Sequence, residues 1–248
     1  KRAVLGFLPK NWRYNFIRQS LNLPKSLDPQ LCIKVAKTKE EFEEAFEVLH
    51  DTLVDFKEIS TQANNIWLTK FHALPTTTVI VAKWNNEVIG TVSLTTDSAF
   101  RLPSDSIVDI NSLRSHSEKN IGELYGLGLR PHHTNVFFPL IKFTYEYARR
   151  YQGIDDLIVA TSRDSLLSEL VEALFFAQQI NGDWGASQNV KHIDLHHTYF
   201  QLVKTYWGRK PSQDLYSFFH KKNFSQLSFP ELENTPPQHP KMSPEQLD

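Results

Sequence analysis

The sequence lacks several features that would place it in a common class of protein. Its 248 residues include a single cysteine, Cys32, which excludes a framework of internal disulfide bonds and suits a reducing cytoplasm. The formal net charge is −1, which gives no electrostatic reason to bind nucleic acid. No apolar run reaches the roughly 18 residues that a membrane-spanning helix requires. We therefore expect a soluble, cytoplasmic protein without a nucleic-acid partner.

The composition divides the chain into three segments. Residues 1–29 are basic and aromatic and are interrupted by prolines, which predicts a short amphipathic helix over Asn11–Leu21 and then a linker. This N-terminal helical arm is expected to pack on its own domain, and contact with a membrane surface or a partner is the alternative. Residues 30–224 are the predicted domain. Residues 225–248 are rich in proline and polar groups, which predicts a disordered tail.

Apolar periodicity in the middle segment predicts alternating strands and helices. The expected strands are Leu31–Ala36, Thr76–Trp84, Val88–Thr95, Asn120–Leu129 and Asp156–Thr161. The expected helices are Lys39–Phe56, Thr61–Ala73, Val136–Tyr151 and Ser165–Gln179, while Val190–Tyr206 fits either element. Thr38 and Glu41 form a predicted capping box, and Asn85-Asn86 is a predicted hairpin turn. The order predicts an α/β fold with a mixed, mostly antiparallel sheet flanked by helices.

A carboxylate and two glycines gather on one predicted strand. Glu123 lies near the start of that strand, where partial desolvation raises a carboxyl pKa toward a value useful to a general base. Gly126 and Gly128 follow, and glycine within a strand commonly marks a bulge or the close approach of a ligand to the backbone. A bulge here would free an N–H for a thioester carbonyl and its developing oxyanion. For the residues alone, the alternative is a solvated edge-strand glutamate in a surface ion pair.

An ordered series of short motifs leads up to this strand. It consists of Gly90-Thr91-Val92-Ser93-Leu94, Asp97-Ser98, Leu102-Pro103, Asp105, Leu113-Arg114, and then Glu123 with Leu127. The series resembles that of the GNAT acyltransferase superfamily and, within it, of the long-chain N-acyl amino acid synthases of the FeeM type, relatives of acyl-homoserine lactone synthases. The specific motifs are confined to residues 88–129, and a weaker general similarity extends from about Ile33 to Ile180.

The resemblance implies a GNAT-like fold and a reaction. A long-chain fatty acyl group would move from acyl carrier protein to the amine of an amino acid or a similar small amine. No cofactor would be tightly bound, with acyl-phosphopantetheine or acyl-CoA as co-substrate, and Glu123 would be the base. The residues implied to hold the donor are Tyr125, Gly126, Leu127, Gly128, Leu129, Arg130, Thr134 and Asn135. Those implied to lie near the acceptor or to cover the acyl chain are Asp97, Ser98 and Arg101.

Two departures from the superfamily pattern bear on donor and mechanism. Acetyltransferases usually have glycines after this strand that wrap a pyrophosphate, whereas Arg130–Phe138 contains none. Thr134 and Asn135 are expected to cap the next helix, whose N–H groups would face the single phosphodiester of a carrier-protein arm. Ser162–Leu167 replaces the usual proline, histidine and phenylalanine-tyrosine pair, so the acid for the leaving thiolate is unassigned. An acetyl-CoA-dependent N-acetyltransferase and a catalytically degenerate domain that binds an acyl ligand or partner are the alternatives.

Other features have plainer interpretations. His192, Asp194 and His196 alternate, as metal ligands on one strand face would, but we expect a polar strand face and no metal site. The Phe137-Phe138 and Phe175-Phe176 pairs are expected in the core and not in an acyl tunnel. Three basic residues of the helix after the cleft either meet an acidic carrier protein or form a solvated face, namely Lys142, Arg149 and Arg150.

Overall fold

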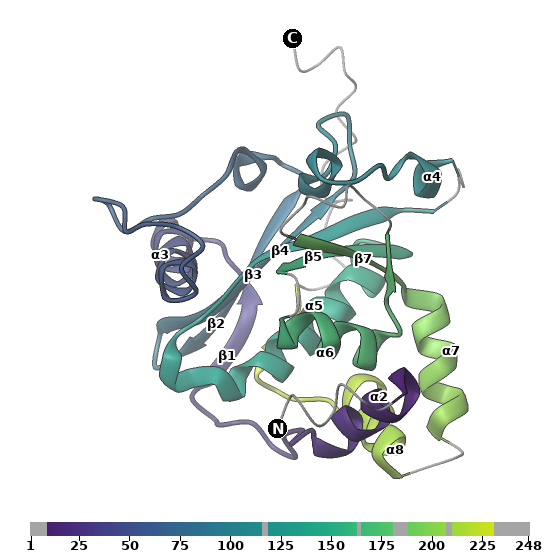
Figure 1. Cartoon of the computed structure of the whole chain (residues 1–248). Coiled ribbons are helices and arrows are strands. Elements are labelled where there is room, and N and C mark those ends of the chain that lie inside the picture. The colour runs from purple at the N-terminus through teal and green to yellow at the C-terminus, as the bar shows by residue number, and fades with distance from the viewer. Residues whose placement is uncertain (1–8, 116–118, 163–164, 181–187, 207–209, 231–248) are drawn as a thin grey trace.

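The computed structural model describes residues 9–115, 119–162, 165–180, 188–206 and 210–230. These residues form one eight-stranded sheet with helices on both of its faces (Figure 1). In sheet order the strands are β6 (Gln178–Gln179), β7 (Gln188–Asp194), β5 (Asp156–Ser162), β4 (Ile121–Leu129), β3 (Glu87–Thr96), β2 (Thr77–Trp84), β1 (Leu31–Val35) and β8 (Leu227–Ser228). Within the same ranges no helix has both the length and the apolar character needed to cross a membrane.

Two of the strand pairs are parallel and the others are antiparallel. β4 runs parallel to β5, and β1 runs parallel to β8. The remaining neighbours pair in the antiparallel direction. The predicted α/β fold with a mixed, mostly antiparallel sheet is therefore confirmed.

The helices form a layer on each face of the sheet. α3 (Lys39–Asp55) covers one face, and α5 (Phe137–Arg150) and α6 (Leu166–Phe175) lie against the other (Figure 1). α2 (Lys10–Ser20), α7 (Leu195–Tyr206) and α8 (Lys210–Tyr216) gather beyond α6 (Figure 1). α4 (Asn111–Arg114) lies in the connection between β3 and β4. α5 supplies much of the core, because its Leu140, Phe143 and Tyr147 are fully buried.

The start of α3 follows the prediction in part. The Thr38 side chain accepts a hydrogen bond from the Glu41 backbone N–H, as an N-cap does. The Glu41 carboxylate does not return that bond to Thr38, but accepts one from the Lys37 backbone N–H at 2.9 Å. It also accepts bonds from Lys34 of β1 and Lys83 of β2, so Glu41 ties the helix to the sheet. Desolvation raises the pKa of Glu41, but these hydrogen bonds outweigh it and hold the pKa at about 2.

The prediction of a helix over Thr61–Ala73 is wrong. Only Lys70–Ala73 forms a helical turn, of the 3-10 type. Asn64 and Asn65 form a turn instead, since the Asn64 side chain accepts a bond from the Ile66 N–H and Asn65 has a φ of 51°. Asparagine competes with helix in this way because its side chain bonds to nearby backbone.

Two further predicted boundaries moved. Val190–Tyr206 contains both candidate elements, a strand that ends at Asp194 and a helix that begins at Leu195. The Asp194 carboxylate accepts a bond from the His197 N–H at 2.7 Å, which favours the change at this point. The predicted helix Ser165–Gln179 ends early, because Phe176 adopts a left-handed conformation with a φ of 54°.

The N-terminal helix and the last described residues both pack on the domain. Glu172 of α6 accepts a bond from Tyr14 and pairs with Lys10, and Arg18 donates to the Ala173 carbonyl at 2.6 Å. At the other end, Leu227 pairs with Ile33, so the sheet continues past residue 224, where the predicted tail begins. Residues 1–8 and 231–248 lie outside the described residues.

Candidate active site

β4 and β5 diverge in the middle of the sheet. They pair only from Ile121–Asp156 to Leu124–Val159, and the described residues include no strand partner for β4 beyond Leu124 on the β5 side. On its β3 side, β4 has a bulge, because the pairing steps from Ser93–Tyr125 to Thr91–Gly128. Gly126 and Leu127 therefore lie opposite the single residue Val92, and Gly126 has a φ of +62°. The result is a stretch of β4 backbone that has no neighbouring strand on the β5 side at the point where the two strands separate.

An apolar cavity opens where the strands separate. Its walls are the backbone and side chains of β4 around the bulge, β5, and the inner faces of α5 and α6, and the space with its open mouth amounts to about 740 Å³. Residues from β7 and the start of α7 also contribute. Its lining includes Leu124, Leu127, Phe137, Ile141, Val159, Leu170, Leu174, Phe175 and Ile193. Phe137 and Phe175 therefore line the cavity, which corrects the prediction that both belong only to the core.

Glu123 lies on β4 and is almost completely buried, with 1% of its surface exposed. One carboxylate oxygen accepts the Ser104 backbone N–H at 2.9 Å, and the other accepts the Ser104 hydroxyl at 2.7 Å. Burial raises the pKa of Glu123 to about 7 against the effect of these two bonds, and the charges of Asp105 and Asp97 raise it further. A carboxyl group with this pKa can exchange a proton near neutral pH. The alternative of a solvated surface glutamate is excluded by the burial.

Arg114 stabilises the connection between β3 and β4 through bidentate ion pairs with two aspartates. The Arg114 guanidinium donates to both oxygens of Asp97 at 2.7 and 2.9 Å, and to both oxygens of Asp105 at 2.6 and 2.5 Å. These bonds hold the pKa of Asp105 below its usual value despite desolvation. Because Asp105 follows Ser104 directly, the arginine also positions the serine over Glu123.

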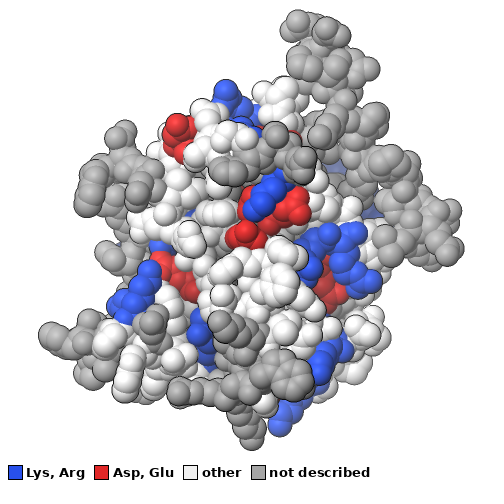
Figure 2. All heavy atoms as spheres, turned by 90° about the vertical axis from the view of Figure 1, so that its right-hand side faces the viewer, with Lys and Arg blue, Asp and Glu red and all other residues white. Residues whose placement is uncertain are grey.

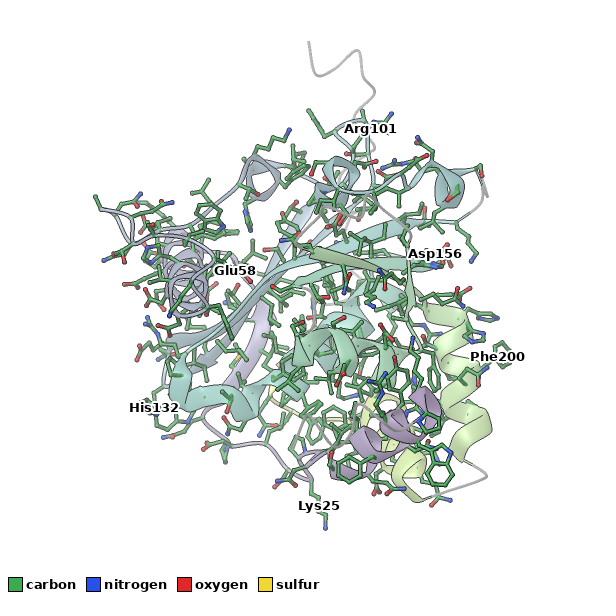
Figure 3. The ribbon with its side chains drawn as sticks, viewed as in Figure 1. Lys25, Glu58, Arg101, His132, Asp156 and Phe200 are labelled. Atoms are coloured by element: carbon green, nitrogen blue, oxygen red, sulfur yellow. The ribbon has the colours of Figure 1, made fainter. Side chains whose placement is uncertain are left out.

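Asp97, Ser98 and Arg101 do not form one site with Glu123 by direct contact. Asp97 is bonded to Arg114, and the Ser98 hydroxyl accepts from the Phe100 N–H. Arg101 is 59% exposed and points away from the body of the molecule at its outer edge (Figure 3). These residues shape the connection, and none of them bonds to Glu123.

The predicted donor-binding residues after β4 differ in their surroundings. Arg130 is half-buried and lies 3.3 to 3.7 Å from three carboxylates, those of Asp51, Glu47 and Glu87. Thr134 and Asn135 are exposed, and they belong to a 3-10 turn over Pro131–Val136. No side chain caps α5, so the predicted capping by Thr134 or Asn135 is wrong. The 3-10 turn runs directly into the helix and takes the place of a cap.

A histidine that the sequence did not single out lies beside the bulge. His72 packs against the Tyr125 ring with 4.8 Å between ring centroids, and against Phe46 at 5.0 Å. Burial lowers the pKa of His72 to about 4, so its imidazole is neutral near pH 7.

Ser104 was also not identified from the sequence, because Ser104 and His72 each reach the site from a separate loop. A signal for Ser104 was present, because Pro103 at the first position of a helical turn predicts ordered backbone there.

His192, Asp194 and His196 belong to two different elements. His192 bonds to Asp156 at 2.8 Å, while His196 belongs to α7 and not to the strand, so the three alternating residues do not share a strand face. The described residues contain no cluster of metal-ligating side chains.

Lys142, one of the three basic residues of α5 considered for contact with a carrier protein, is buried. It pairs with Glu146 and donates to the Phe219 carbonyl at 3.0 Å, so it cannot meet a partner protein.

A comparison with models of protein families shows which family the chain belongs to. The family model of the N-acyl amino acid synthase FeeM matches residues 44–180, which is more than half of the chain. The chain belongs to the FeeM family. This match confirms the predicted resemblance to the N-acyl amino acid synthases of the FeeM type. The chain is an N-acyltransferase with a GNAT-like fold. No curated protein sequence matches it.

Solved structures of related enzymes share the fold of this FeeM-family chain. FeeM, an N-acyl amino acid synthase from uncultured soil microbes, is 16% identical, with a TM-score of 0.58 over 73% of this chain and all of its own. The CoA-dependent acyl-homoserine lactone synthase BjaI is 14% identical, with a TM-score of 0.56 over 82% of this chain and 96% of its own. The acyl-homoserine lactone synthase LasI is 10% identical, with a TM-score of 0.50 over 66% of this chain and 90% of its own.

Proposed function

We propose that this FeeM-family protein transfers a long-chain fatty acyl group from the thioester of acyl carrier protein to the amine of an amino acid or a similar small amine. The observation that carries the proposal is the apolar cavity at the separation of β4 and β5. Its lining is almost wholly apolar and comes from several elements at once, which suits the burial of an alkyl chain. An acetyl group would contact little of this lining, so the cavity favours a long acyl chain.

The exposed backbone of β4 supplies the contacts for the donor arm. Beyond Leu124, N–H and C=O groups on the β5 side have no strand to pair with in the described part of the chain, so they can bond to the amides of a phosphopantetheine arm. The arm would follow Tyr125–Leu129 and deliver the acyl chain into the cavity. The thioester would then lie at the bulge, where Gly126 and Leu127 have no partner residue of their own on β3 and a backbone N–H could bind its carbonyl.

The reaction needs one proton acceptor and no cofactor. The neutral amine attacks the thioester carbon, a C–N bond forms, and the carbonyl electron pair moves to the oxygen. The pair then returns, the C–S bond breaks, and the thiolate leaves. Glu123 accepts the proton that the amine loses, and in the net balance the thiol gains one proton. Glu123 is suited to this role because it has a pKa of about 7.

The Ser104 contacts set a condition on this mechanism. Both carboxylate oxygens of Glu123 are bonded to Ser104, and Ser104 itself is fully buried. An amine therefore reaches Glu123 either after the loop that carries Ser104 moves, or through the Ser104 hydroxyl as a relay.

The stretch after β4 bears on which thioester is the acyl donor. Arg130 is already surrounded by three carboxylates, and Arg130–Phe138 contains no glycine, so a pyrophosphate has few partners there. This favours the single phosphodiester of a carrier-protein arm. Acyl-CoA is the alternative donor, because the structural neighbour BjaI is CoA-dependent.

A donor panel tests the proposal. Purified protein is incubated with dodecanoyl–acyl carrier protein, dodecanoyl-CoA or acetyl-CoA, together with a mixture of amino acids, and products are identified by mass spectrometry. The proposal predicts an N-dodecanoyl amino acid, formed fastest from the carrier protein and absent with acetyl-CoA. Binding of the dodecanoyl thioester without any N-dodecanoyl product would refute the proposed transfer from this donor to an amino acid.

A further inference from the structure

The ring of His72 is held in a fixed orientation by its own turn. Thr69 caps the 3-10 turn Lys70–Ala73, and its backbone N–H donates to His72 Nδ1 at 2.9 Å. The imidazole also packs in an edge-to-face arrangement with the Phe46 ring and in a tilted arrangement with the Tyr125 ring. A side chain locked by packing and by a hydrogen bond to its far atom is preorganised, which is what a catalytic donor requires.

These contacts also determine where the ring carries its hydrogen. A backbone N–H is always a donor, so Nδ1 must be the accepting nitrogen. Because burial keeps the imidazole neutral near pH 7, its single hydrogen is on Nε2. His72 therefore presents an N–H donor and no lone pair on its Nε2 side, and it cannot take the proton of the amine.

The Nε2–H group is aimed at the bulge in β4. His72 Nε2 is buried and has no hydrogen-bond partner among the described residues. A Cβ added to Gly126 would lie 3.3 Å from this nitrogen and 3.6 Å from the Ser93 hydroxyl oxygen. A Cβ at this distance would be closer than ordinary contact, so the absence of a side chain at Gly126 lets the buried donor lie directly against the backbone of the bulge. Leaving such a donor unpaired costs about 1–3 kcal/mol unless a ligand atom completes it.

We propose that the His72 Nε2–H donates a hydrogen bond to the carbonyl oxygen of the bound acyl thioester, beside the backbone of the bulge at Gly126. The inference rests on the proposed acyl transfer. As the amine attacks, the carbonyl electron pair moves to this oxygen, and the Nε2–H bond strengthens as negative charge develops. The hydrogen stays on Nε2 throughout, and the proton balance remains with Glu123 and the thiol.

Two substitutions separate the donor from the bulk of the ring. In His72→Gln the amide nitrogen can reach the position of Nε2, whereas His72→Phe keeps the ring and removes the donor. With dodecanoyl–acyl carrier protein and a saturating amino acid, we expect His72→Phe to lower kcat about a hundredfold, as loss of one oxyanion donor does elsewhere. His72→Gln should keep most of the activity, and KM for both substrates should change little. His197→Phe on the exposed side of α7 is the matched control and should behave as the original protein does.

Three outcomes would overturn the inference. One is an unchanged kcat in a folded His72→Phe protein. Another is equal loss in His72→Phe and His72→Gln at unchanged thermal stability. The third is a rise in KM for the amino acid alone, since that would place His72 on the acceptor carboxylate.

A measurement on the unmutated protein keeps the inference testable if His72→Phe fails to fold. In the ¹⁵N-labelled protein, dodecanoyl-CoA should shift the His72 Nε2–H resonance, and free coenzyme A should not. No shift on binding, in a protein that forms the amide, contradicts the role of His72. Absence of amide with every donor would instead refute the proposed function, so the two failures are distinguishable.

Discussion

Glu123 is held in surroundings that oppose its ionisation. Two bonds from Ser104 favour the carboxylate, but burial and the nearby charges of Asp105 and Asp97 oppose it more strongly. A purely structural carboxylate is usually paired with a cation, as Glu41 is with Lys34 and Lys83. The described residues offer Glu123 no such cation, and this difference separates a candidate base from a structural anchor.

The pH dependence of the reaction should report the Glu123 carboxylate. If the ionised form is the base, kcat/KM should rise with pH in a first step whose midpoint is about 7. In Glu123→Gln this step should be absent, while a second rise above about 8, from the acceptor amine, stays in both proteins. A step near 7 that survives in Glu123→Gln would assign the titration to another group.

The same group should make folding stability depend on pH. The folded pKa is raised above the unfolded one, so the unfolded chain loses its proton first, and stability falls as pH rises from about 4.5 to about 7. Glu123→Gln should therefore be more stable than the original protein by about 1–3 kcal/mol at pH near 8, and no more stable at pH near 4. Urea denaturation at the two pH values measures this. A gain in stability of equal size at both would contradict the raised pKa.

Residue-scale prediction from sequence succeeded where the signal was local. Glu123 followed by two glycines on a strand pattern identified the strand position, and the bulge formed at Gly126. Ser104 and His72 reach the same region from loops that lie 19 and 51 residues before Glu123 in the chain. Nothing in the local pattern of either loop shows which strand it will cover.

At the scale of elements, β4 and α3 approach each other without intervening side chains. A Cβ on Gly128 would lie 2.9 Å from the Leu49 Cα and 3.1 Å from the Leu49 N, so Gly128 lets the helix backbone rest on the strand. Leu49 also lies beside the bulge, 3.2 Å from the position of a Cβ on Gly126. The close approach of α3 therefore determines the shape of the site.

Two glycines with equal crowding should respond differently to alanine. A Cβ on Gly90 would also meet an atom at 2.9 Å, but that atom is the end of the flexible Leu129 side chain. We expect Gly128→Ala to cost about 3 kcal/mol because helix backbone must move, and Gly90→Ala about 1 kcal/mol. Thermal or urea unfolding of both variants checks the order, and a larger cost for Gly90→Ala would contradict it.

Element boundaries were predictable where a cap or a turn residue has one meaning. Thr38 capped α3, and Asn85-Asn86 formed the hairpin turn, with φ values of 50° and 69°. The helix expected over Thr61–Ala73 failed because apolar spacing was outweighed by the turn at Asn64 and Asn65. At Asp194 the strand and helix patterns overlap, and only the tertiary structure decides between them.

At the scale of the whole molecule, the cavity arises from the separation of two strands. It needs β4 and β5 to part, and α5 and α6 to cover the gap, so no single segment encodes it. Its apolar residues fit a solid core equally well in the sequence. Phe137 and Phe175 were assigned to the core for this reason, although they line the cavity.

The buried side chains that line the cavity should limit the length of the acyl chain. Leu174 of α6 lines the cavity and is 1% exposed, whereas Leu166 on the same helix is 69% exposed. Leu174→Trp should exclude a few terminal methylenes, each worth about 0.8 kcal/mol, and lower kcat/KM for a dodecanoyl donor about thirtyfold. A hexanoyl donor should be little affected, and Leu166→Trp should resemble the original protein with both. Equal loss with both donors would mean that the acyl chain lies elsewhere.

The charged side chains on one face of the molecule bear on how a carrier protein would dock. Among the described residues on the face shown in Figure 2, basic and acidic side chains lie interspersed in small groups and do not form one basic patch. An acidic carrier protein would therefore gain little from long-range attraction to this face. Docking near the cavity mouth, where the phosphopantetheine arm enters, is the arrangement that the proposed function requires.

The most direct test of the central claim is the coupled formation of thiol and amide from dodecanoyl–acyl carrier protein and amino acids. Thiol release is followed with a chromogenic disulfide, and the N-dodecanoyl product by mass spectrometry, in the original protein, in Glu123→Gln, and in Glu43→Gln as a surface control on α3. The account predicts equal amounts of thiol and amide in the original protein and in Glu43→Gln, and a loss of about a hundredfold or more in Glu123→Gln. Thiol and amide formed at the same rate by Glu123→Gln would contradict the role of this carboxylate, and the absence of amide from every protein would contradict the proposed transfer.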